Sequence, residues 1–173
     1  MILKVIGGIM ILSACGVLGI AAANKYSLRP KDIRRFRASI QMLETEIIYG
    51  CTPLPHAFNN ISAKVEGPLK NFYSMISDEL NGGCSYNLDT TWSKGVNKLV
   101  GETFLKSADK DLIAGFGKVL GSSDREDQKK HFELFYIQLK QHEEAAEEER
   151  HKNEKMYKTL GFLSGLVIFI LLV

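Results

Sequence analysis

Histidines and cysteines are the first residues to consider for chemistry, because they supply many of the nucleophiles and metal ligands used at neutral pH. No two of the four histidines are spaced as metal ligands on one helical turn. They are His56, His131, His142 and His151. Neither Cys-x-x-Cys nor His-Glu-x-x-His occurs in the chain. Cys51 lies near His56, but a tight turn with a small buried thiol explains it better than a nucleophile and its base. The sequence therefore predicts no catalytic residue, metal site or cofactor.

Glycines and glutamates give no stronger signal for catalysis. Gly115, Gly117 and Gly121 lack the Lys-Ser/Thr that completes a phosphate-binding loop, and close helix packing explains them better. Glu44 and Glu46 are two residues apart, so they point to different faces of a helix and cannot act as a paired acid and base. Surface pairing or a bond to a neighbouring helix end is the expected use of these two carboxylates.

The charges are unevenly distributed although the net charge is only +2, too small to imply a nucleic-acid partner. Residues 25–37 carry six bases against the single acid Asp32. An acidic segment with no base follows much later in the chain: Glu143, Glu144, Glu147, Glu148 and Glu149. A helix that is polar on nearly all sides either bridges solvent or is bound by a partner. The acidic segment is thus either a solvated face or a docking surface.

Apolar residues at alternating spacings of three and four predict helices throughout, and no segment shows strand-like alternation. Helices are expected to begin at Pro30, at Thr52-Pro53, at Gly67-Pro68, near Leu88 and after Ser107. A capping box at Ser123 to Glu126 starts the last helix, which nothing breaks before Val173. We expect an all-α, antiparallel six-helix bundle. Its predicted core holds Phe36, Leu43, Phe58, Phe72, Trp92, Phe116, Phe132 and Leu139.

Both ends of the chain are apolar. Val5 to Ala23 is a run of 19 apolar or small residues, and the chain ends in an apolar stretch from Leu160. The lengths predict an N-terminal transmembrane helix over 1–24, a bundle with its stalk over 25–155, and a C-terminal transmembrane helix over 156–173. Basic residues beside both runs predict that the bundle lies in the cytoplasm. Gly161 and Gly165 form a small-residue motif suited to close contact between transmembrane helices.

Two other readings of the N-terminal run remain open. Ala21 to Ala23 could be the cleavage site of a signal peptide, and Cys15 lies in a sequence similar to a lipoprotein box. Either would make the chain an exported helical binding module. The three cysteines, Cys15, Cys51 and Cys84, are odd in number and imply no disulfide framework, so a reducing compartment is expected for the middle of the chain.

Several segments, taken together, resemble the stage III sporulation protein AB family over essentially the whole chain. The matching segments are Arg29-Pro30, the run from Gln41 to Leu54, the run from Phe116 to Gly121, Asp124-Arg125, Gln128, Lys130-His131, the run from Glu154 to Tyr157, and the run from Leu160 to Leu163. Four residues of the first long run are singled out as family-motif residues: Glu44, Tyr49, Gly50 and Pro53.

This resemblance implies a function in endospore-forming bacteria. The soluble part of the family is similar to the helical domain of platform proteins in type II secretion and type IV pilus systems. The resemblance implies a mother-cell membrane subunit of a channel complex that links mother cell and forespore. Its expected partners are a cytoplasmic secretion-type ATPase, other membrane subunits and membrane lipid. The acidic segment is the expected ATPase dock.

Overall fold

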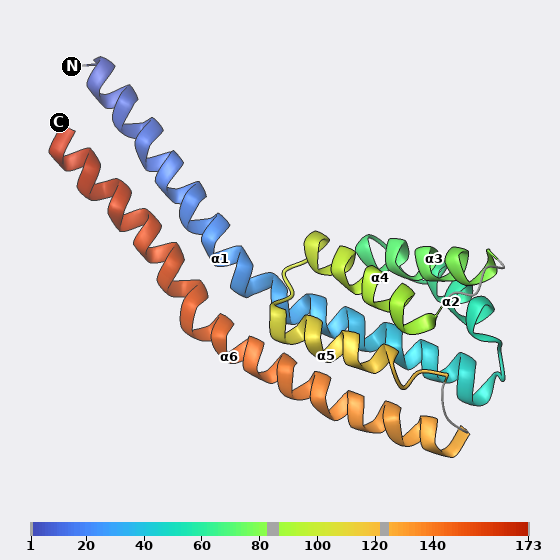
Figure 1. Cartoon of the computed structure of the whole chain (residues 1–173). Coiled ribbons are helices and arrows are strands. Elements are labelled where there is room, and N and C mark those ends of the chain that lie inside the picture. The colour runs from blue at the N-terminus through green and yellow to red at the C-terminus, as the bar shows by residue number, and fades with distance from the viewer. Residues whose placement is uncertain (1, 83–86, 122–124, 173) are drawn as a thin grey trace. The chain divides into compact units, whose positions relative to one another are not determined.

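The computed structural model describes residues 2–82, 87–121 and 125–172. Side chains of residues 2–6, 8, 9, 11, 12, 169, 171 and 172 are outside this description, as is Cys84. The helices, shown in Figure 1, are α1 (Ile2–Glu44), α2 (Leu54–Ser62), α3 (Pro68–Asn81), α4 (Leu88–Glu102), α5 (Ser107–Gly117) and α6 (Arg125–Leu172), and a π-helical turn (Thr45–Tyr49) follows α1. The described residues contain no strand, which confirms the all-α prediction.

The chain forms two compact units. The helical domain is Lys31–Glu143, and the terminal helix pair is Met1–Pro30 together with Glu144–Val173. The long helices α1 and α6 each contribute to both units. The three-part division predicted from the sequence, with borders after residues 24 and 155, describes a membrane arrangement and remains a prediction.

Aromatic rings fill the core of the helical domain. Trp92 is fully buried, and its indole N–H donates to the Ile113 carbonyl oxygen at 2.8 Å. The Phe116 ring stacks on the Phe135 ring with centroids 4.2 Å apart. Gly117 allows α5 to lie close to the Trp92 ring, because a Cβ at position 117 would lie 2.4 Å from Cδ1 of Trp92. All eight predicted core residues are at most 5% exposed, so the predicted core is confirmed.

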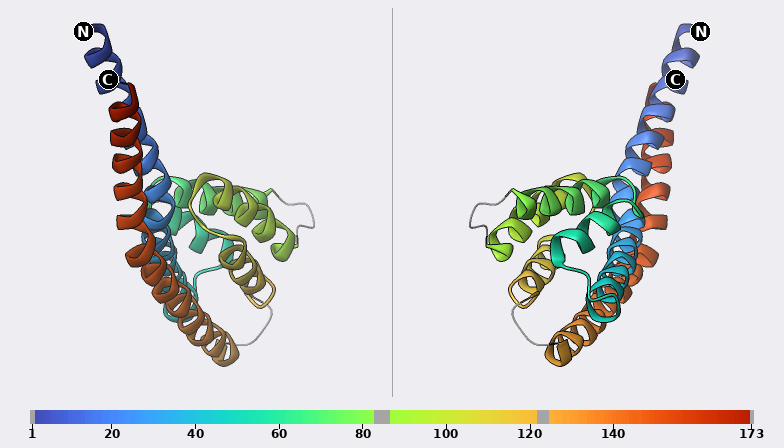
Figure 2. Two further views of the ribbon diagram at one scale, coloured as in Figure 1. Left: turned by 90° about the vertical axis from the view of Figure 1, so that its left-hand side faces the viewer. Right: turned by 90° about the vertical axis from the view of Figure 1, so that its right-hand side faces the viewer.

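The helices of the terminal helix pair run side by side in opposite directions (Figures 1 and 2). They approach closest at two glycines, where a Cβ on Gly161 would lie 2.7 Å from Cα of Gly19. The Tyr26 and Tyr157 rings stack with centroids 5.4 Å apart. Further along, the buried Arg29 guanidinium donates to Glu149 at 2.9 Å. Small residues, one aromatic pair and an ion pair therefore hold this unit together.

Two predicted helix starts are wrong. Pro30 does not open a helix, because α1 runs through it from the apolar N-terminal run. A proline inside a helix loses one hydrogen bond and costs ~3 kcal/mol. Its neighbours Arg29 and Ile33 are buried. Thr52 is not the cap of α2. The cap is Pro53, and the Thr52 hydroxyl donates instead to the Glu46 carboxylate at 3.1 Å. The capping box predicted at Ser123 falls partly outside the described residues.

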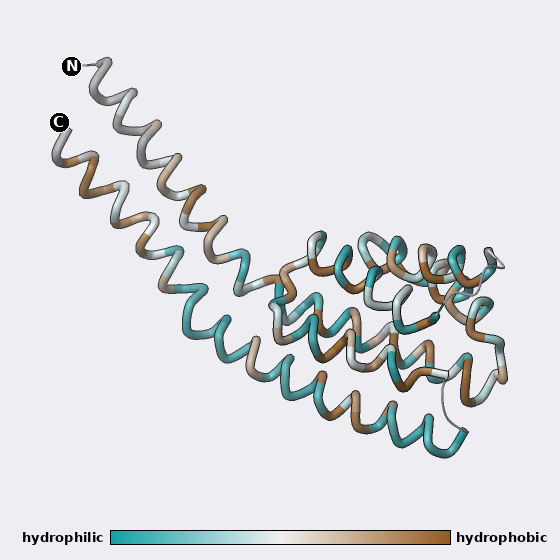
Figure 3. Tube along the Cα trace, viewed as in Figure 1, coloured by the Kyte–Doolittle hydropathy of each residue, from teal (hydrophilic) through white to brown (hydrophobic). Residues whose placement is uncertain are grey.

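The predicted transmembrane helices are not supported. Among the residues that the structure describes, no helix is long and apolar enough to cross a membrane. Much of the N-terminal run that led to the prediction has side chains outside the description. Figure 3 shows that the end of α6 is mainly hydrophobic, whereas the segment before it is hydrophilic.

Candidate docking surfaces

The family-motif residues lie on one turn of the helical domain, Glu44–Pro53, which we call the motif turn. The π-helical turn ends at Gly50, whose N–H donates to the Thr45 carbonyl at 2.9 Å. A Cβ on Gly50 would lie 2.7 Å from the Glu46 carbonyl oxygen, so only glycine fits without a shift. The chain then reverses and Thr52 N–H donates to that same carbonyl at 2.9 Å. Backbone hydrogen bonds within the turn therefore hold its conformation.

Glu46 ties the motif turn to α2 and the loop that follows. Its carboxylate accepts hydrogen bonds from Lys64 at 2.9 Å, Asn60 at 3.0 Å and Thr52 at 3.1 Å. The Lys64 ammonium, followed by the Asn60 amide, lowers the pKa of Glu46 below its ordinary value of 4.5. The carboxylate is ionised at neutral pH and acts as a structural acceptor.

Glu44 faces the other side, as its spacing from Glu46 predicts. Its carboxylate accepts a hydrogen bond from the Tyr136 hydroxyl at 2.8 Å. Burial, together with this bond to Glu44, raises the pKa of Tyr136, so the phenol keeps its proton and remains the donor. Glu44 thus fixes α1 to α6 within the helical domain.

Tyr49 is the exposed member of the motif turn, with 69% of its surface accessible. A large aromatic side chain on a turn held by hydrogen bonds is a preorganised contact for a partner, because little conformational entropy remains to be lost. Pro53 caps the adjacent α2 and contributes rigidity to the same turn.

Arg125 of α6 holds the motif turn from outside. Its guanidinium donates to the Ile48 carbonyl oxygen and to the Cys51 thiol sulfur, the latter at 3.0 Å. Cys51 is exposed and has a φ of 51°, so the prediction of a buried thiol is wrong. The left-handed turn conformation directs its side chain outward to the arginine.

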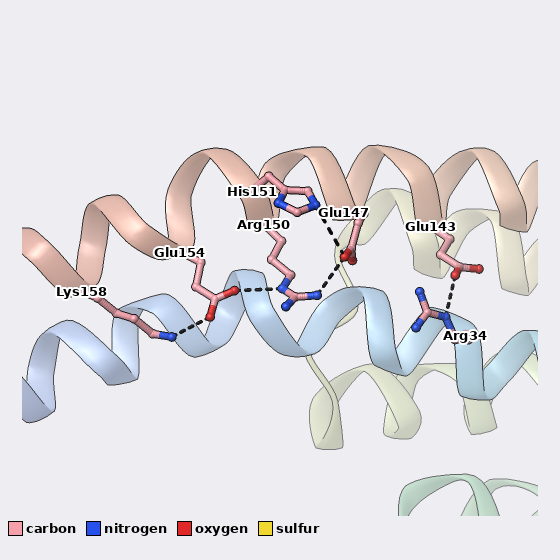
Figure 4. Close-up of polar contacts among 7 residues, drawn as sticks. All are labelled: Arg34, Glu143, Glu147, Arg150, His151, Glu154 and Lys158. Carbon is pink, nitrogen blue, oxygen red and sulfur yellow. Dashed lines mark hydrogen bonds and ion pairs between the residues drawn. The ribbon is translucent and has the colours of Figure 1, made fainter.

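Three carboxylates of the acidic segment form ion pairs with arginines. In the helical domain, the buried Glu143 pairs with Arg34 at 2.7 Å and Arg37 at 3.2 Å. In the terminal helix pair, Glu147 pairs with Arg150 at 2.8 Å (Figure 4). Glu149 accepts a hydrogen bond from Arg29 at 2.9 Å. Glu144 and Glu148 are the exposed members of the segment. The exposed acidic surface is thus smaller than the five carboxylates suggest.

A ladder of charges continues along α6. Glu154 accepts from Arg150 at 2.8 Å and from Lys158 at 2.6 Å (Figure 4). Lys158, then Arg150, lowers the pKa of Glu154 to about 2. These i,i+4 pairs agree with the helical spacing expected at Glu154 and Lys158.

Gly161 and Gly165, predicted to serve transmembrane packing, both lie in the terminal helix pair. Gly161 lies against the backbone of Gly19, and Gly165 is buried. The partner glycine on α1 was not singled out from the sequence, because it lies more than 140 positions away and has no flanking motif.

No metal-ligating constellation is found in the described ranges, where no three His, Cys, Asp or Glu side chains could hold one ion. One histidine makes a buried contact: His142 Nδ1 lies 2.7 Å from Oδ1 of Asp109. Asp109 also accepts from the Lys106 N–H at 2.8 Å and so caps α5. The His142–Asp109 pair joins α5 to α6, and the sequence alone did not indicate it.

The comparisons with known proteins agree with one another. A family model described as Stage III sporulation protein AB matches residues 4–173. The chain is 39% identical over 170 residues to stage III sporulation protein AB of Bacillus subtilis (strain 168), covering 98% of this chain and 99% of that protein. A solved structure of a stage III sporulation protein AB has a TM-score of 0.65 and 36% identity, covering 71% of this chain and 96% of the solved one.

Proposed function

The chain belongs to the stage III sporulation protein AB family, and from that premise we propose that it is a non-catalytic platform of a secretion-like channel complex. In this proposal it is attached to the mother-cell membrane facing the forespore by its apolar ends. Its helical domain lies in the cytoplasm and docks a secretion-type ATPase, alongside other membrane subunits of the channel.

The main observation in favour of a platform is the internal rigidity of the helical domain. Its core is a continuous cluster of aromatic rings, and its exposed motif turn is closed by backbone hydrogen bonds. A surface that binds a motor benefits from such rigidity, since preorganised contacts lose less entropy on binding. The shared membership in a sporulation family supplies the biological setting.

We propose the exposed acids of the terminal helix pair, Glu144 and Glu148, as the ATPase dock. They lie one turn apart on α6 and so share a face. A basic surface on the ATPase would be attracted to them mainly through faster association that weakens with salt. The other three acids of the segment would serve to fix the helices instead.

The motif turn is the competing dock, and one binding experiment separates the two. The full-length chain in detergent would be immobilised, and association of the purified ATPase measured at low and high salt for three proteins: the unmodified chain, the Glu144→Lys/Glu148→Lys variant and the Tyr49→Ala variant. We expect slower association for the double variant alone. If only Tyr49→Ala weakens binding, the dock is the motif turn.

A further inference from the structure

The end of α6 exposes large apolar side chains. Leu160, Phe162, Leu163, Val167 and Ile170 are each 49–65% exposed. In Figure 3 this segment is mainly brown, with short white stretches between the hydrophobic residues. Proteins rarely leave a contiguous apolar surface of this kind in water. The segment therefore requires an apolar cover.

Along α6, acidic residues come first and basic residues lie nearer to this apolar surface. Residues 150–158 carry four bases, Arg150, Lys152, Lys155 and Lys158, against the single acid Glu154. The five acids of the acidic segment all lie farther from Leu160. At 1.5 Å per residue, the bases lie within about 15 Å of the apolar surface. An anionic membrane surface attracts nearby bases and repels acids, which explains this order.

Three of the bases line a groove on α6. A shallow groove of about 340 Å³ is lined by Arg150, His151, Glu154, Lys155, Lys158 and Thr159. Glu154 holds the Arg150 and Lys158 head groups in place through its two hydrogen bonds. Three permanent cations line the groove, and two carboxylates offset them, Glu154 in the lining and Glu147 through its ion pair with Arg150 at 2.8 Å, so one net positive charge remains. A net positive groove with fixed N–H donors and a hydroxyl suits a phosphate ester.

An aromatic pair lies beside the groove. Tyr157, between Lys155 and Lys158, stacks on Tyr26 of α1 at 5.4 Å. Tyrosines concentrate at the interface between lipid and water, where one end of the ring contacts apolar material and the other is hydrated. The aromatic pair lies level with the end of the basic groove, close to the start of the apolar stretch at Leu160.

We propose that the groove lined by Arg150, Lys155, Lys158 and Thr159 binds the phosphate headgroup of an anionic phospholipid. The acyl chains of the lipid cover the adjoining apolar surface from Leu160 onward. This inference rests on the membrane attachment in the proposed function, and it adds the class of lipid and the residues that select it.

The test uses the full-length chain and two kinds of vesicle, phosphatidylcholine alone and phosphatidylcholine with about one-third phosphatidylglycerol. The partition ratio between anionic and neutral vesicles is measured by flotation. We expect the ratio to exceed one and to fall with salt. Each base near an anionic surface strengthens binding about fivefold, so the groove variant Arg150→Gln/Lys155→Gln/Lys158→Gln should lower the ratio at least tenfold. Partition into neutral vesicles should not change.

A charge-matched control replaces three exposed lysines of the helical domain, Lys98→Gln/Lys118→Gln/Lys129→Gln, and should keep the unmodified ratio. Circular dichroism verifies that both triple variants remain helical. The inference is overturned if the unmodified ratio is one, or if the control lowers the ratio as much as the groove variant.

A further arm separates a lipid site from a site for free phosphate. Inorganic phosphate is titrated into the detergent-solubilised chain, and saturable binding that disappears in the groove variant would overturn the lipid assignment. Failure of the proposed function looks different. Without membrane attachment the chain would not float even with neutral vesicles, and without docking the ATPase would fail to bind while the lipid ratio stayed intact.

Discussion

The helical domain and the terminal helix pair hold their helices together by different physical means. In the helical domain, large aromatic rings interlock, with Trp92, Phe116 and Phe135 in direct ring contact. In the terminal helix pair, backbone approaches backbone at Gly19 and Gly161. Rings exclude water from a core, whereas glycine contacts suit helices whose outer faces are covered by something else. The two units therefore differ in kind: one has an aromatic core, and the other is a pair of helices in close backbone contact.

Removing a central ring should cause the largest loss of stability. We expect Phe116→Ala to lower the free energy of unfolding of the helical domain by about 3–5 kcal/mol, because the side chain is 5% exposed and leaves a cavity. The single tryptophan, Trp92, is buried in this domain, so its fluorescence during denaturation of the full chain reports the effect. A loss below 1 kcal/mol would contradict the tight aromatic core.

Adding one methyl group to the same core tests its packing. Gly117→Ala would place a Cβ 2.4 Å from the Trp92 ring, and overpacking costs about 1–3 kcal/mol. Gly115→Ala is the matched control, because a Cβ there meets nothing within 4 Å. The same fluorescence measurement should show destabilisation for position 117 and none for position 115. Equal behaviour of the two variants would mean that the Trp92 contact is not tight.

The corresponding change in the terminal helix pair should leave Trp92 unaffected. Gly161→Ala would bring a Cβ to 2.7 Å from the Gly19 backbone, which cannot yield as a side chain can. We expect faster amide hydrogen exchange in residues 15–23 and 157–165 and an unchanged Trp92 unfolding transition. Gly16→Ala, where a Cβ meets nothing within 4 Å, is the control. A shifted Trp92 transition would remove the distinction between the two units.

The smallest effect concerns Glu46 and pH. Its folded pKa is lowered below 4.5, so its stabilisation is complete above that ordinary value and is lost as pH falls through the folded pKa. We expect Glu46→Gln to cost less than about 1 kcal/mol at neutral pH, typical of a solvent-accessible ion pair. The difference between variant and unmodified chain should shrink as denaturation is repeated at acid pH. A difference that grows toward low pH would contradict the ion pairs at Glu46.

Local patterns predicted the helices and the core well. The helical spacing of apolar residues, and the prolines and glycines at helix ends, can be recognised within short stretches of sequence. The sequence-based predictions failed where the structure depends on contacts between residues far apart in the chain. The motif turn depends on Arg125, 77 positions from its acceptor at Ile48, and Glu143 is buried by Arg34, 109 positions away. Local rules also favoured a helix start at Pro30, yet the preceding segment is itself helical and α1 continues. Three carboxylates of the acidic segment, which the sequence allowed as either a solvated face or a docking surface, pair with arginines.

The central claim is that the chain brings a cytoplasmic ATPase to a membrane. Its most direct test is flotation of the purified ATPase with vesicles that carry the full-length chain. The account predicts that the ATPase floats with these vesicles, remains at the bottom with empty vesicles, and is released when Glu144→Lys/Glu148→Lys replaces the unmodified chain. The claim would be contradicted if the ATPase stayed at the bottom with chain-bearing vesicles or floated equally well with empty ones.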